Sequence, residues 1–412
     1  MNRTCATAIA VGLIVYAGSV TAEPLTFSAA LERATATAPS VQASTAGVDA
    51  TRSASIAAGQ LPDPTLSVGI DNFPISGPPA FTLNGDSMTM ERVGIEQAFP
   101  NPAKRRAQVG RAQADIGMAE ADLAVETQNI RLATAMAWID LYYAKRRLAQ
   151  LELLNNSLID LQATVTARLA SGTARPSQAL EPEQLRAAIA DRRAELLAEV
   201  TKARARLARL TGDPDVDVYG DAPVLEVDGP ALRAHVASLP RLQALDARVR
   251  TADADVTLAQ ADKRPDWRVG TSYGRRDPAY GDMVSVTFSI DLPFFGKRRQ
   301  DPLIAARESD ARRAGLTREA GERNILAELE ADLADYALHL QRLTNARNTL
   351  VPLAKRRAEL DLASYAAGKL DLGSALLSTL ALAEAEVDAL SREADVARDA
   401  VRINYTYAEG RP

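Results

Sequence analysis

Residues 97–106 read QAFPNPAKRR, and residues 290–299 read IDLPFFGKRR. Each stretch ends a run of alternating apolar and polar residues with a proline, and each continues through a basic triplet into a long segment rich in alanine and charge. Both therefore predict a strand, a proline stop and a long helix, in that order. The same order of signals twice in one chain indicates an internal two-fold repeat.

The spacing of other prolines agrees with this repeat, because Pro64 follows Pro39 by the same number of positions as Pro265 follows Pro240. We divide the chain into a signal (1–22), a first repeat (23–211), a connection expected to be non-helical (212–239), a second repeat (240–403) and a tail (404–412). Each repeat begins with a helix, and the elements that follow are β-hairpins at 65–98 and 266–292, long helices at 103–171 and 299–367, and return helices at 177–210 and 372–403.

The first residues resemble a secretory signal. Arg3 precedes the apolar run 8–17, and Val-Thr-Ala at 20–22 is a small-residue cleavage pattern, so the mature chain is expected to begin at Glu23, outside the cytoplasm. The only cysteine, Cys5, lies inside this signal, and we expect neither a disulfide nor a lipid anchor on the mature chain. No apolar run reaches the roughly 20 residues of a membrane helix, so a membrane crossing would have to use a β-barrel.

Composition argues against several functions. The formal net charge is −5 with positive and negative residues interspersed, which does not favour nucleic-acid binding. The two histidines, His235 and His339, are far apart in the chain and no cysteine accompanies them, so no metal site is expected. No catalytic constellation or phosphate-binding glycine loop stands out. The sequence therefore predicts no enzyme and no cofactor.

The predicted strands are apolar on one side only. Leu66, Val68 and Ile70 alternate with small or polar residues, and the strand that begins at Trp267 shows the same pattern. Such strands also suit a sandwich of two sheets. Four strands joined to long helices have no second sheet to pack against, so this setting favours a membrane surface.

The first long helix carries two apolar stripes with heptad spacing. One stripe begins at Val109 and the other at Met118. The stripes are offset by two residues, which corresponds to about 200° around a helix, so the helix is apolar on two nearly opposite sides. Two seams allow helices to join side by side into a sheet or tube. The second long helix is less regular, and Pro352 is expected to kink it.

Paired hairpins, long helices and glycine turns together resemble the TolC-like outer-membrane factor family, over nearly the whole mature chain. The Gly296-Lys297-Arg298 segment is similar to the heavy-metal cation efflux branch, which includes CzcC-like proteins. The resemblance implies an α + β membrane protein, a homotrimer whose chains each give four strands to one twelve-stranded barrel in the bacterial outer membrane. A helical barrel would continue into the periplasm. It further implies a passive exit duct that receives substrate from an inner-membrane pump of RND type and a periplasmic adaptor, and the heavy-metal branch implies heavy-metal cations as that substrate.

The resemblance also implies sites at the far ends of the long helices. The expected adaptor-docking tips are Arg168, Leu169, Gly172, Thr173, Tyr365, Gly368, Lys369 and Leu370. For the two glycines, simple helix capping is the alternative. Aspartates close the pore in some relatives, and here Asp371 and Ser374 are the gate candidates.

A last set of residues follows the strands and is expected at the inner rim of the membrane, near lipid phosphates. These residues are Phe99, Lys104, Arg105, Arg106, Trp267, Phe294, Phe295, Lys297, Arg298 and Arg299. A solvated helix start is the alternative for the basic triplets. For the whole protein, a non-channel periplasmic coiled-coil scaffold or adaptor is the alternative to a duct, but it does not explain one-sided apolar hairpins.

Overall fold

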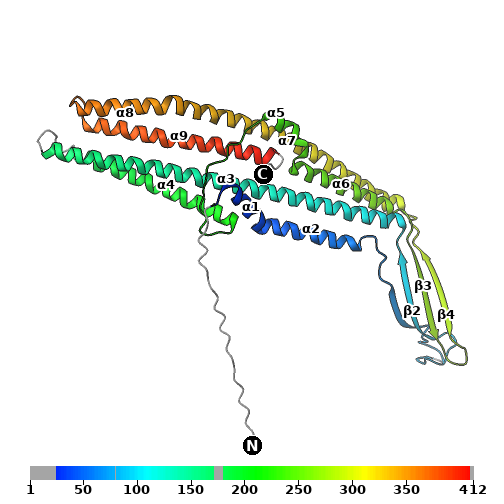
Figure 1. Ribbon diagram of the computed structural model, residues 1–412. Coiled ribbons are helices and arrows are strands. Elements are labelled where there is room, and N and C mark those ends of the chain that lie inside the picture. Colours follow the sequence, from blue (N-terminus) through cyan, green and yellow to red (C-terminus); the bar gives the residue numbers. More distant parts are fainter. Residues whose placement is uncertain (1–24, 79, 171–179, 409–412) are drawn as a thin grey trace, which may run out of the picture.

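The structure is a computed structural model that describes residues 25–78, 80–170 and 180–408. Figure 1 shows an elongated bundle of helices with a small sheet projecting from one end. The helices are α1 (Phe27–Thr37), α2 (Pro39–Ala57), α3 (Pro102–Ala170), α4 (Glu181–Thr211), α5 (Gly229–His235), α6 (Pro240–Ala261), α7 (Gln300–Asn345), α8 (Val351–Ala366) and α9 (Leu372–Tyr407). Within the described ranges, no helix combines the length and apolar character that a membrane span requires.

The sheet consists of β1 (Thr65–Asp71), β2 (Met90–Phe99), β3 (Trp267–Arg275) and β4 (Met283–Ile290). All neighbours are antiparallel, and the order β1-β2-β3-β4 leaves β1 and β4 at the edges. The central pair β2 and β3 joins the two repeats, with Val93 opposite Tyr273. The sheet is therefore assembled from both halves of the chain.

The register aligns the apolar side chains of all four strands on one face. Val68 lies opposite Val93, and Tyr273 lies opposite Val284. This face is uncovered in the single chain, since Val68 is 74% exposed and Val286 is 76% exposed. The predicted one-sided strands are present, and among the described residues no second layer covers them.

The longest helix, α3, has 69 residues and forms the axis of the bundle. It contacts α2 and α6 in the half near the sheet and α4 and α9 in the half away from it (Figure 1). Neighbours on more than one side agree with the two apolar stripes of its sequence. A buried cluster at mid-length centres on Trp138, whose indole N–H donates to the Leu25 carbonyl at 3.0 Å.

The second half departs from the predicted regular helix. α7 ends at Asn345, a π-helical turn covers Ala346–Leu350, and α8 begins at Val351 with Pro352 in its first turn. A proline has no N–H to donate, and a wider turn just before it adjusts the hydrogen-bonding pattern. The irregularity expected at Pro352 is therefore a π-helical turn just ahead of it.

Two further features differ from the sequence-based expectation. The connection 212–239 is predicted to be non-helical, yet it contains α5. Asp228 caps this helix, because its carboxylate accepts from the Ala231 N–H at 3.2 Å. Asp-Gly-Pro is a helix-start signal, with a capping carboxylate ahead of a first-turn proline. At the other end, α9 continues beyond 403 to Tyr407, whose hydroxyl donates to Asp332 at 2.9 Å and whose ring is buried.

Candidate functional site

The corner between β2 and α3 is held by one buried side chain, Asn101. Its Oδ1 accepts from the Lys104 backbone N–H at 2.8 Å, which caps the start of α3. Its Nδ2 donates to the Asp266 carboxylate at 3.0 Å and to the Arg264 carbonyl at 3.2 Å. Because Arg264 and Asp266 belong to the turn between α6 and β3, Asn101 fastens the corner of the first repeat to the second repeat.

The first basic triplet takes part in the same corner. Lys104 Nζ lies 2.9 Å from Asp262 and 3.4 Å from Asp266. The hydrogen bond to Asp262 is the main cause that raises the pKa of Lys104. Arg105 donates from Nε to the Gly59 carbonyl at 2.7 Å. Two of the three residues of the first basic triplet therefore make contacts within the protein.

Electrostatics at this corner favour an ionised Asp266. Burial alone would raise the pKa of this carboxyl group, but the hydrogen bonds from the backbone and side chain of Asn101, with the charge of Lys104, outweigh it and lower the pKa. Beside this corner, Phe99 and Trp267 stack with their ring centroids 4.3 Å apart. Two of the four aromatic residues expected at the rim thus meet on the apolar sheet face, at the end of the sheet next to the helices.

The second basic triplet has a different environment. Lys297, Arg298 and Arg299 are exposed, and none of the ion pairs in the described part of the chain includes them. Phe294 and Phe295, just before the triplet, are 80% and 69% exposed. The repeated motif therefore has an internal role in one half of the chain and a solvent-facing position in the other.

At the far end of the bundle, α8 ends in a glycine turn. Gly368 has a φ of +72°, and its N–H donates to the Tyr365 carbonyl at 3.0 Å, while the Lys369 N–H donates to the Ser364 carbonyl at 2.9 Å. This pair of bonds is a Schellman motif, which needs a left-handed residue at the glycine position. Helix capping therefore accounts for Gly368 in the single chain.

The other tip residues divide into two groups. Tyr365 and Leu370 pack into an apolar cluster that joins α8 and α9 to α4, so they stabilise the tip from within. Arg168 and Leu169 lie in the last turn of α3. Gly172 and Thr173 lie outside the described residues. In the second tip, the structure thus places Tyr365 and Leu370 in one cluster. The turn of the first tip lies beyond the described part of the chain.

The two gate candidates bond to each other at the start of α9, where Asp371 is the N-cap. Asp371 accepts from the Ser374 N–H at 2.9 Å and from the Ser374 hydroxyl at 2.7 Å, and these bonds lower the pKa of Asp371. A Cβ atom on Gly373 would lie 3.1 Å from a carboxylate oxygen of Glu181 and 3.3 Å from one of Asp371. Burial, followed by the charge of Asp371, raises the pKa of Glu181. Two carboxyl groups therefore lie at this tip.

Sequence reasoning missed Glu181. It lies in the first turn of α4, next to a proline, and a carboxylate in that position is ordinary for a helix start. Only the packing of α4 against α9 brings it near Asp371, so its local sequence gives no signal of the pairing.

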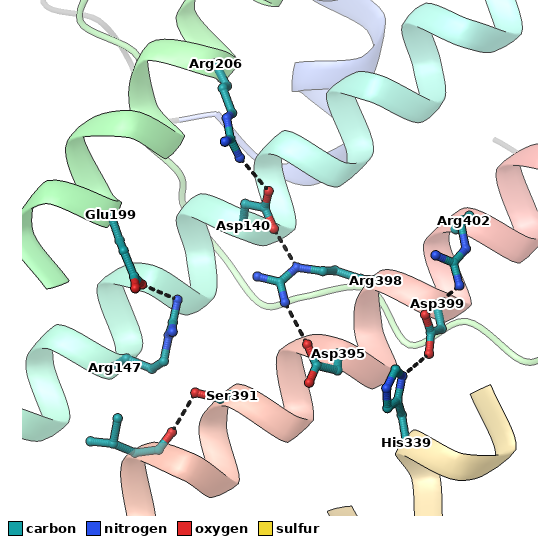
Figure 2. Close-up of polar contacts among 11 residues, drawn as sticks. Asp140, Arg147, Glu199, Arg206, His339, Ser391, Asp395, Arg398, Asp399 and Arg402 are labelled. Atoms are coloured by element: carbon teal, nitrogen blue, oxygen red, sulfur yellow. Dashed lines mark hydrogen bonds and ion pairs between the residues drawn. The ribbon is translucent and has the colours of Figure 1, made fainter. Parts of the chain in front are cut away.

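Mid-bundle, charged side chains link three helices, as Figure 2 shows. Arg398 on α9 lies 2.6 Å from Asp140 on α3 and 2.8 Å from Asp395. Arg206 on α4 lies 3.6 Å from the other oxygen of Asp140. Nearby, His339 lies 2.6 Å from the buried carboxylate of Asp399, so this histidine has a structural partner. In the described ranges no cluster of three potential metal ligands was found.

The same arrangement of helices and strands occurs in solved structures. The outer-membrane channel OprN superposes with a TM-score of 0.78 at 19% identity, over 93% of this chain and 90% of that one. The chain has the fold of outer-membrane channels. The CmeC outer membrane channel of Campylobacter jejuni gives 0.77 at 12% identity, over 93% and 85% of the two chains. VceC, an outer membrane protein from Vibrio cholerae, gives 0.76 at 16% identity, over 93% and 96%.

These matches confirm, at the level of the fold, the resemblance indicated by the sequence. The helices and the four-stranded antiparallel sheet are shared over nearly the full length of both chains, so the channel fold accounts for the whole described architecture. No protein-family model matches the sequence, and a comparison with curated sequences finds no significant match.

Proposed function

We propose that this protein is the outer-membrane exit duct of a tripartite efflux system. The observation that carries the proposal is the uncovered apolar face of the sheet, on which Val68, Val286 and Phe288 are 74%, 76% and 64% exposed. Soluble proteins rarely expose a large continuous apolar patch without a partner. Lipid is the environment that suits a sheet face of this kind, and the channel fold supports this assignment.

Barrel closure requires further copies of the chain. β1 and β4 are edge strands, whose unpaired backbone groups would be costly in a bilayer. Three copies, each giving four strands, would close one twelve-stranded barrel. β2 and β3 have 10 and 9 residues, which agrees with the roughly 9–11 residues of a transmembrane strand.

The helices would form the periplasmic part of the same trimer. Exposed apolar side chains also occur on helices at the sides of the bundle, among them Ile56 on α2 and Leu316 on α7, at 75% and 67% exposure. We propose that neighbouring copies cover them and complete a helical barrel. The order of elements is consistent with an ancestral duplication that produced residues 23–211 and 240–403, joined by 212–239.

Partners would dock at the end away from the membrane. We propose that the turns after α3 and α8 contact a periplasmic adaptor, which links the duct to an inner-membrane pump of RND type. The duct itself would be passive, and the pump would supply the energy. Asp371 and Ser374 would lie at the narrow end, where their mutual hydrogen bonds fix the start of α9.

Heavy-metal cations are the substrate class that we propose, on the basis of the short Gly296-Lys297-Arg298 segment. A deletion strain would be challenged with divalent cations and, separately, with organic toxicants. Selective sensitivity to cations is the expected result. Selective sensitivity to organic toxicants would contradict this substrate class while leaving the duct intact.

Cell fractionation tests the membrane assignment. The protein is expected in the outer-membrane fraction, with an N-terminus at Glu23 and as a trimer that dissociates on heating in detergent. Recovery as a soluble periplasmic monomer would overturn the proposal and would favour a scaffold or adaptor role.

A further inference from the structure

We propose that the junction after β4 binds the phosphate group of an anionic phospholipid in the membrane leaflet that faces the periplasm. This inference rests on the proposed function, because it requires the sheet to lie in the outer membrane with its junction at the periplasmic side. It adds a lipid site in the second repeat that the first repeat lacks.

The junction contains a cavity of about 440 Å³. Its lining includes Lys263, Phe294, Phe295, Lys297, Arg298 and Gln300. They come from the turn after α6, the segment after β4 and the first turn of α7. The cavity therefore lies where the proposed barrel strand gives way to the helix, at the level of lipid headgroups.

The charge of this cavity favours an anion. Lys297 and Arg298 are exposed and form no ion pair within the described chain. The carboxylate that lines the cavity, Asp301, is 2.5 Å from Lys263 and is neutralised by it. Two cationic side chains consequently remain available, and Lys and Arg donate strong charge-assisted hydrogen bonds to phosphate oxygens.

Comparison of the two repeats explains why these cations remain unpaired. In the first repeat, Lys104 is paired with Asp262 and Asp266, which flank the turn between α6 and β3. The repeat alignment that matches Pro64 with Pro265 puts Leu61, in the turn before β1, and Thr65, the first residue of β1, at the corresponding positions. That turn has one carboxylate, Asp63, so a neighbouring copy would bring fewer negative charges to Lys297 and Arg298 than Lys104 receives.

Two further features suit a lipid better than a free phosphate ion. Phe294 and Phe295 are among the most exposed large apolar side chains of the protein, and they lie directly beside the cationic residues. Aromatic rings at the level of headgroups pack against the upper part of acyl chains. A ligand with an anionic group and an apolar tail can contact both the cationic side chains and the exposed phenylalanine rings.

The start of α7 adds a preference for the headgroup. Gln300 begins the helix, and no side chain caps it. Unpaired N–H groups at a helix start carry partial positive charge, which adds to the attraction for phosphate. The cationic side chains and the helix start thus fit the phosphate of an anionic phospholipid such as phosphatidylglycerol.

Native mass spectrometry of the full-length trimer tests the proposal. Delipidated protein would be titrated with phosphatidylglycerol and, separately, with zwitterionic phosphatidylethanolamine. The test variant is Lys297→Gln with Arg298→Gln. The matched control is Lys355→Gln with Arg356→Gln, which removes the same charge from exposed positions on α8, away from the sheet.

Wild-type protein is expected to bind phosphatidylglycerol more tightly than phosphatidylethanolamine. Loss of two basic residues beside an anionic lipid should weaken that binding about thirtyfold, while the control stays within about twofold of wild type. Equal binding of the two lipids, an unchanged affinity in the test variant, or full competition by millimolar inorganic phosphate would overturn the proposal.

Failure of the lipid site and failure of the proposed function give different results. All substituted side chains are exposed, so the test variant is expected to form trimers and to enter the outer-membrane fraction as wild type does. Normal insertion with unchanged lipid affinity would reject the lipid site alone. A wild-type protein that does not reach the membrane would reject both.

Discussion

Asn101 gives the sharpest prediction about the junction. Replacement by Ala removes the cap on the Lys104 N–H, worth about 1 kcal/mol. It also removes the Nδ2 donor that reaches Asp266 and the Arg264 carbonyl, and buried acceptors that lose a donor cost about 1–3 kcal/mol. We therefore expect Asn101→Ala to lower the local stability of the corner by about 2–4 kcal/mol.

Hydrogen exchange measured by mass spectrometry reports this local stability directly. A loss of about 2–4 kcal/mol corresponds to exchange about 30- to 700-fold faster for the first-turn amides of α3, where the Lys104 amide is the one bonded to Asn101. Peptides from the start of α9 lie at the opposite end of the bundle and serve as the internal control (Figure 1).

A second variant separates the two parts of this cost. Asn101→Ser retains a hydroxyl that can cap α3 but has no amide to reach Asp266, so its exchange rate should lie between those of wild type and Asn101→Ala. Unchanged exchange at the start of α3 in Asn101→Ala, or an equal acceleration at both ends of the molecule, would refute the assigned role of Asn101.

Three other predictions concern the tips and the mid-bundle network. Gly368→Ala should lower the free energy of unfolding by about 1–2 kcal/mol, because φ is +72° and the space around a new Cβ is open; equal urea midpoints would contradict this. The raised pKa of Glu181 means that the folded chain holds this proton more tightly, so its contribution to stability falls as pH rises from about 4.5 through the raised pKa. Glu181→Gln should remove that fall in urea midpoints measured from pH 4 to 7, whereas the nearby Glu183→Gln should keep it. Arg398→Met should cost about 1 kcal/mol, and a double-mutant cycle with Asp140→Asn should show a coupling of similar size; additive effects would contradict the pairing.

The strands and the long helices could be predicted because their signals are local. Alternation from Trp267 and around Val68 sets one face of each strand, and the prolines mark where the backbone period changes. Local pattern does not say which strands pair. The β2–β3 pairing across the two repeats, with Val93 opposite Tyr273, depends on how the halves pack together.

The site could be predicted only in part, because its interactions connect distant positions. Asn101 bonds to a carboxylate 165 positions later in the chain, so its sequence neighbourhood showed no more than a helix start. The two basic triplets look alike, yet Lys104 is paired and Lys297 is not, since only the turn before β3 supplies Asp262 and Asp266. Gly368 could be predicted, in contrast, because a left-handed residue at a helix end is a local property and glycine is the residue that favours it.

Conductance in a planar lipid bilayer tests the central claim, that this chain forms a water-filled duct through the outer membrane. Purified trimers added to one side of the bilayer should insert and produce discrete, reproducible current steps, and heat-dissociated protein should produce none. If the purified protein stays in solution as a monomer and gives no current steps, the assignment of the apolar sheet face to lipid is contradicted, and the duct with it.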